Sequence, residues 1–126
     1  MSYLIVFFGA GIGGALRHGV NLAAGRWLGA GFPAGTLIVN VLGSLLIGFL
    51  AGLFLARPGL SQGLRLFLTT GLLGGFTTFS AFSLDTALLI QRDAAVQALA
   101  YVILSVALGL LAFFGGLALS RTGLLS

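Results

Sequence analysis

Four long apolar runs, separated by short connections, constrain the fold of this chain more than any other feature of its sequence. A helix needs about 20 mainly apolar residues to cross a bilayer. The runs extend roughly over residues 3–23, 33–55, 66–90 and 95–119. No connection is long enough to separate domains, so we expect an all-α membrane protein, with residues 1–126 forming a single domain of four transmembrane helices.

The charge content supports this assignment and excludes a nucleic-acid-binding protein. Charged residues make up 6% of the chain, whereas soluble domains average about 25%. The net charge of +4 comes from scattered arginines that form no basic patch, so we expect a lipid partner and no nucleic acid. The start, Met1-Ser2-Tyr3, has no basic segment, which favours a retained first helix over a cleaved signal.

The residue types needed for catalysis are scarce. The chain has one histidine, His18, two aspartates and no cysteine, so no metal cluster or nucleophile–base pair can be assembled at a credible spacing. The glycines of residues 9–14 fit a dinucleotide-binding pattern but lack the acidic residue that should follow about 20 positions later. We therefore expect that the chain is not an enzyme.

The arginines give almost no bias toward one orientation in the membrane. Four spans place both termini and the second connection on the same side. The arginines then divide equally between that side and the other: Arg57, Arg65 and Arg121 against Arg17, Arg26 and Arg92. Because orientation follows such a bias, the balance favours insertion in both directions and an antiparallel homodimer. A single topology fixed by other signals is the alternative.

Many of the 21 glycines are expected to pack helices together. Gly9 and Gly13, for example, are four residues apart, and two further pairs in the second and third runs share this spacing. Such pairs let membrane helices approach closely.

The third run is interrupted by Gly74-Gly75, followed by the hydroxyls of Thr77 and Thr78. A broken helix in a membrane is tolerated where its freed backbone groups find partners. Because Thr78 lies near the middle of the run, we expect a break close to the bilayer centre. The freed carbonyls of two antiparallel chains could then share one small cation, and ligation by oxygen alone suits Na⁺.

Polar and aromatic residues flank this break. Phe79 and Phe82 share one helix face, and their ring edges carry partial positive charge that can face an anion, although lipid contact or packing is the alternative. Asn40 either bonds a neighbouring helix or faces a polar pathway. Arg17 either extends to the membrane surface or forms an electropositive vestibule. Asp85 is expected to pair with an arginine or water.

Three segments together resemble the Fluc (CrcB) family of bacterial fluoride channels. They are the glycine-rich first run ending in Leu16-Arg17, the second-run residues Gly35-Thr36-Leu37, Asn40 and Gly43-Ser44, and the run Gly-Gly-Phe-Thr-Thr-Phe-Ser-Ala-Phe over 74–82. The resemblance covers essentially the whole chain.

The resemblance implies an antiparallel, dual-topology homodimer in the inner (plasma) membrane, with two pores that export fluoride passively and a central structural Na⁺. It also implies a role for each matching residue. The fluoride pore would be lined by Asn40, Phe79, Phe82, Thr78, Ser80 and Ser105, the vestibule by Arg17, and the Na⁺ would be held by the backbone carbonyls of Gly74 and Thr77.

The chain departs from the family pattern at three positions. Ala81 replaces a threonine, Asp85 replaces a residue that is often glutamate, and Gly109 lacks a hydroxyl one turn after Ser105. Two other functions stay open. A small multidrug exporter would need a membrane carboxylate, and the first two runs contain none. A non-transporting assembly subunit would explain the glycines but not Asn40.

Overall fold

The computed structural model describes residues 1–122 and contains four helical segments that are long and apolar enough to cross a membrane. Residues 123–126 of the expected domain lie outside this description. The elements are α1 (Ser2–Leu28), α2 (Ala34–Ala56), a third segment composed of α3 (Gln62–Leu66), η1 (Phe67–Leu73), α4 (Gly74–Phe76) and α5 (Phe79–Gln91), and α6 (Ala95–Ser120). The prediction of four helical segments long and apolar enough to cross a membrane is therefore confirmed.

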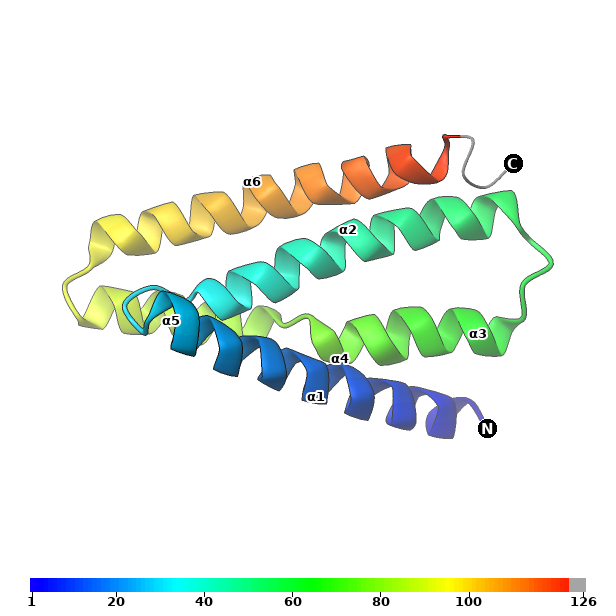
Figure 1. The fold of residues 1–126 in the computed structure, drawn as a ribbon, viewed down its shortest axis with the longest axis horizontal. Helices are drawn as coiled ribbons and strands as arrows, with labels where there is room; N and C mark the ends of the chain where they lie inside the picture. Colours follow the sequence, from blue (N-terminus) through cyan, green and yellow to red (C-terminus); the bar gives the residue numbers. More distant parts are fainter. Residues whose placement is uncertain (123–126) are drawn as a thin grey trace.

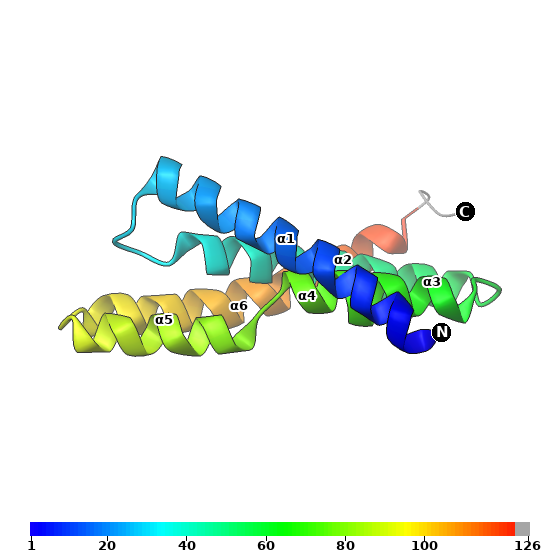
Figure 2. The same cartoon turned by 90° about the horizontal axis from the view of Figure 1, so that it is seen from below.

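The helices form an elongated bundle (Figure 1), in which α2 lies beside α6 and the α5 part of the third segment contacts α6 directly. The N-terminus, the connection from α2 to α3 and the end of α6 lie at one end of the bundle, and the other two connections lie at the opposite end (Figure 1). Helix α1 crosses η1 and α4 obliquely, and its C-terminal half diverges from α5 and α6 (Figure 2).

Close backbone contacts at glycines hold these helices together. A Cβ atom added to Gly9 would lie 2.9 Å from the Cα atom of Gly71, and one added to Gly75 would lie 2.8 Å from the Cα atom of Ala10. Both distances are shorter than real side chains allow, so α1 can approach the third segment only where glycines stand. Similar contacts at Gly48 and Gly116 join α2 to α6. The predicted packing role of the small-residue pairs is confirmed.

The third segment is broken, but the predicted position of the break is wrong. Gly74 and Gly75 remain helical, and the chain becomes extended at Thr77 (ψ 158°) and Thr78 (φ −156°, ψ 119°). The two glycines do not interrupt the helix; they lie where the third segment packs against α1. The preceding turns, Phe67–Leu73, form a π-helix, a rare form that is frequently found at functional sites.

Few side chains are buried within the single chain. One cluster of buried residues combines Val39 with Leu73 and Phe76, on the η1–α4 side of the break. A second combines Leu89, Ala98 and Tyr101, on the α5 side. Most large apolar side chains point outward, as expected for a protein whose solvent is lipid.

Candidate functional site

A groove of about 430 Å³ opens where the third segment is broken. Its walls come from α2, the third segment and α6, and no charged side chain of the described residues lines it. Among its lining residues are Asn40, Gly74, Thr77, Thr78, Phe79, Phe82 and Ser105. The structure therefore brings together the residues that the sequence predicted for the pore and the cation, with the exception of Ser80 and Arg17.

Asn40 on α2 binds both backbone polar groups of Thr78. Its Nδ2 donates a hydrogen bond to the Thr78 carbonyl at 3.0 Å, and its Oδ1 accepts one from the Thr78 N–H at 2.8 Å. One side-chain amide thereby satisfies a residue that has left the helix. Asn40 bonds the extended part of the neighbouring third segment and also lines the groove, so the two interpretations of its role are compatible.

Thr78 begins the second half of the broken helix. Its Oγ1 accepts a hydrogen bond from the N–H of Ala81 at 3.1 Å, which caps the first turn of α5. The same oxygen lies 3.3 Å from the Oγ of Ser80, and either atom can donate. Ser80 thus reaches the groove only through Thr78, and residue 81 contributes its backbone to the cap.

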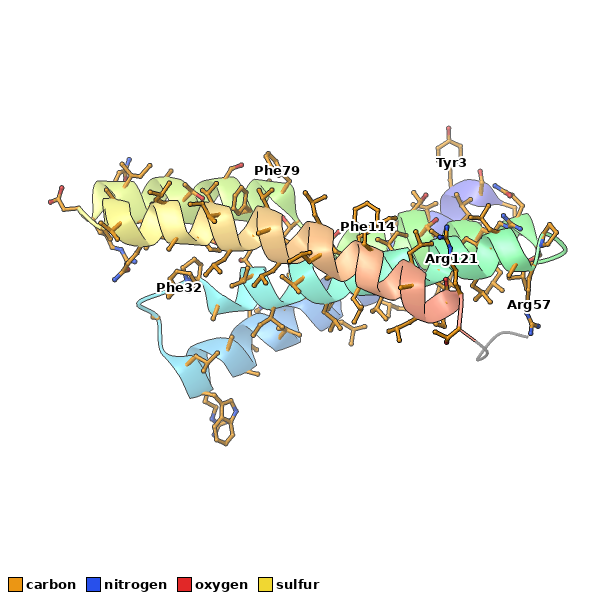
Figure 3. All side chains as sticks on the ribbon, turned by 90° about the horizontal axis from the view of Figure 1, so that it is seen from above. Tyr3, Phe32, Arg57, Phe79, Phe114 and Arg121 are labelled. Carbon is orange, nitrogen blue, oxygen red and sulfur yellow. The ribbon has the colours of Figure 1, made fainter. Side chains whose placement is uncertain are left out.

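Three aromatic rings form a row beside the break. The ring centroids of Phe79 and Phe82 are 5.5 Å apart, and those of Phe82 and Tyr101 are 5.1 Å apart. Phe79 is 78% exposed and projects away from the bundle (Figure 3), whereas Phe82 packs against the buried cluster around Tyr101. Within one chain, the Phe79 ring is therefore exposed on the surface, whereas the Phe82 ring is partly buried in the core.

The carbonyl groups at the break fit a small hard cation. No hydrogen bond within residues 1–122 ends on the carbonyl oxygens of Gly74 or Thr77, whereas the Leu73 carbonyl accepts from both the N–H and the hydroxyl of Thr77. The described residues contain no group of three or more His, Cys, Asp or Glu side chains that could hold a metal. Free carbonyl oxygens suit a hard cation such as Na⁺ and lack the thiolate and imidazole groups that Zn, Cu and Fe prefer.

Arg17 on α1 contacts the backbone of the third segment. Its Nε donates to the carbonyl of Gly75 at 3.2 Å, one of the carbonyls that the end of α4 leaves without a helical partner. The side chain is half-buried there, beside the break and outside the groove.

A second pair of polar residues was not predicted as part of the site. The hydroxyl of Tyr101 donates to Asp85 Oδ2 at 3.0 Å, so within residues 1–122 the partner of Asp85 is a tyrosine and not the expected arginine. Asp85 and Thr36 line a second groove of about 420 Å³ beside α5 and the start of α2. An isolated carboxylate in an apolar helix was a signal in the sequence that Asp85 needs a polar partner. The sequence around Asp85 did not identify this partner, because Tyr101 lies on another helix.

The fold and the groove define the class of protein. Four membrane-crossing helices, one of them broken, surround a groove that offers hydroxyls, an amide and aromatic rings but no charge. These are features of a multi-pass membrane protein that handles a small solute or ion.

The comparisons identify the family within this class. A model of the family described as CrcB-like protein, Camphor Resistance (CrcB), matches residues 4–117, and the chain belongs to this family. A protein of Methylobacterium sp. (strain 4-46) named fluoride-specific ion channel FluC is 64% identical over 110 residues, covering 87% of this chain and 88% of its own length.

Two further relatives carry the same name. The protein of Methylobacterium nodulans is 58% identical over 121 residues, which is 96% of this chain and 97% of the relative. The protein of Rhodopseudomonas palustris (strain BisB5) is 54% identical over 96% of this chain and 98% of the relative. These names are those of channels and not of enzymes, in agreement with the prediction made from the sequence.

Proposed function

We propose that this protein is a fluoride channel, as its relatives are named, and that fluoride passes along the groove at the break. The observation that carries the proposal is the uncharged lining. Hydroxyl and amide donors and ring edges can replace water around a small anion without a fixed charge that would hold it too tightly, and conduction requires release as well as entry.

In this proposal, two copies of the chain form an antiparallel, dual-topology homodimer with two pores. Two features of the single chain support it. Phe79 faces outward beside the groove, where a second chain could complete the wall, and the arginines lie in equal number at the two ends of the sequence-predicted spans. We place the dimer in the inner (plasma) membrane, where a negative interior favours anion exit by about 2.3 kcal/mol per 100 mV.

A structural Na⁺ at the centre of the dimer belongs to the same proposal. The free carbonyls of Gly74 and Thr77 would hold it, and a two-fold axis beside the break would double the number of oxygen ligands. The ion would supply positive charge that satisfies the lone pairs of these carbonyl oxygens and joins the two chains. Arg17, bound to the next carbonyl of the same turn, supports this end of α4 from the side.

The test is ion flux from liposomes that contain the purified protein. We expect fluoride to leave rapidly and chloride to be retained, because a larger anion loses more contacts in a narrow groove than it gains. Equal efflux of the two anions would contradict the proposal. Proton-coupled uptake of organic cations would favour the exporter, and no flux of any ion would favour an assembly subunit.

A further inference from the structure

Ser44 is a groove-lining residue whose hydroxyl hydrogen is not engaged by the described part of the chain. It follows Asn40 by one helical turn on α2 and therefore faces the same side. The hydroxyls of Thr69 and Thr77, which line the same groove, donate to the carbonyls four residues before them. Ser44 makes no such bond within residues 1–122, so its hydroxyl hydrogen is available to a ligand in the groove.

Ser105, on the facing helix α6, presents a second free hydroxyl. Its Oγ is buried and has no hydrogen-bond partner among the described residues, although it lines the groove. A buried polar atom without a partner is costly unless something else satisfies it. Helices α2 and α6 pack along their length, so the two serines lie on opposite walls of the groove.

Gly109 on α6 lies opposite Ser44 on α2. A Cβ atom added at Gly109 would lie 3.6 Å from the Oγ of Ser44, which is an ordinary van der Waals distance. Position 109 lies one turn after Ser105, where the sequence shows no hydroxyl. A hydroxyl on residue 109 would therefore lie beside the Ser44 oxygen, approaching it from the other wall.

We propose that Ser44 is an anion-contacting residue of the groove and that it supplies, from α2, the donor that α6 lacks at Gly109. This inference rests on the fluoride channel proposed above. A small anion that loses its water needs several donors in sequence, and the amide of Asn40 and the hydroxyls of Ser105 and Ser44 provide them on adjacent turns of two helices. Thr69 is excluded from this role because its hydroxyl hydrogen is already donated to the backbone carbonyl of Arg65.

The first experiment compares fluoride efflux from liposomes containing Ser44→Ala, Ser105→Ala and Ser120→Ala. Ser120 is the matched control because it also lies between α6 and α2, but its hydroxyl donates to Leu117 and is outside the groove. We expect roughly tenfold slower efflux for the first two variants, the effect of losing one hydrogen bond to a charged ligand, and unchanged efflux for the control.

A second substitution tests the position of the hydroxyl. Gly109→Ser in the Ser44→Ala background returns a hydroxyl to the same place from the opposite helix, and we expect it to recover most of the efflux. Failure to recover in a correctly assembled protein would overturn the shared position of residues 44 and 109. Unchanged efflux in Ser44→Ala would overturn the role of Ser44 while leaving the channel proposal intact, whereas absent fluoride flux in the unsubstituted protein would overturn the channel itself.

Ser44→Cys keeps the inference testable if Ser44→Ala does not assemble. The chain has no cysteine, so this thiol would be unique. We expect a small anionic thiol reagent to modify it and stop efflux, and Ser120→Cys to conduct normally after the same treatment. Modification of the thiol at position 44 without loss of efflux, or no modification at all, would overturn the inference.

Discussion

At the scale of single residues, the site depends on which polar groups are already satisfied. Asn40 uses one donor and its acceptor to hold Thr78, and it retains a second amide hydrogen for the groove. Its side chain is thus both a support and a candidate ligand, a combination that residue identity alone does not predict.

Asn40→Leu is expected to lower stability as well as flux. It removes both hydrogen bonds to Thr78 and leaves a backbone N–H and a carbonyl without partners, at a cost of about 1–3 kcal/mol for each buried group. Thermal unfolding in detergent should shift to lower temperature, and efflux should fall. An unfolding temperature equal to that of the unsubstituted protein would show that water replaces these bonds.

Phe79→Ile and Phe82→Ile are expected to separate conduction from packing. Both variants lose the polarised ring edge while keeping most of the apolar volume, so both should conduct fluoride at least about tenfold more slowly. Phe82→Ile should also reduce stability, because Phe82 packs against Tyr101 in the buried cluster, whereas Phe79 is exposed within its chain. Normal conduction by both variants would place the anion path elsewhere.

At the scale of elements, the third segment illustrates what sequence can and cannot predict. Its existence, length and interruption follow from hydropathy and from the motif at residues 74–82. The position of the break does not follow, because glycine favours both a helix end and a close contact between helices. Only the approach of Ala10 on α1 shows that Gly75 serves the contact, while Asn40 on α2 stabilises the extended residue Thr78.

The contact between α1 and the third segment gives a prediction with an internal control. Gly13→Ala would bring a methyl group against the Leu72 carbonyl and within 2.8 Å of the backbone nitrogen of Phe76. Gly19→Ala, on the same helix, meets nothing within 4 Å. We expect only the first variant to lose stability, by about 1–3 kcal/mol, as measured by denaturation in detergent. Equal stability of the two variants would mean that α1 shifts without cost.

At the scale of the whole molecule, arginines lie at both ends of the bundle. Arg57 and Arg121 lie near the end that holds the N-terminus (Figure 3), and Arg92 donates to the Gly31 carbonyl at the opposite end. The sequence predicted this division from the even number of spans. The helix surface that would contact a partner chain could not be predicted from hydrophobic periodicity, because lipid-facing and partner-facing surfaces are both apolar.

Reporter fusions to the C-terminus are expected to appear on both sides of the membrane. Near-equal arginine counts provide no strong orienting signal, so each orientation should hold a substantial share of the molecules. Adding two or three lysines to one connection should bias the population and lower fluoride efflux. A single orientation in the unmodified protein would contradict the antiparallel dimer.

The division of the buried residues into two clusters has a consequence for local unfolding of the protein. One cluster holds η1 and α4 against α2, the other holds α5 against α6, and the extended pair Thr77–Thr78 joins them without a helical connection. Free energies of opening can differ between such units. Amide hydrogen exchange should therefore proceed in two cooperative steps, with α5 opening first while η1 and α4 stay protected against α1.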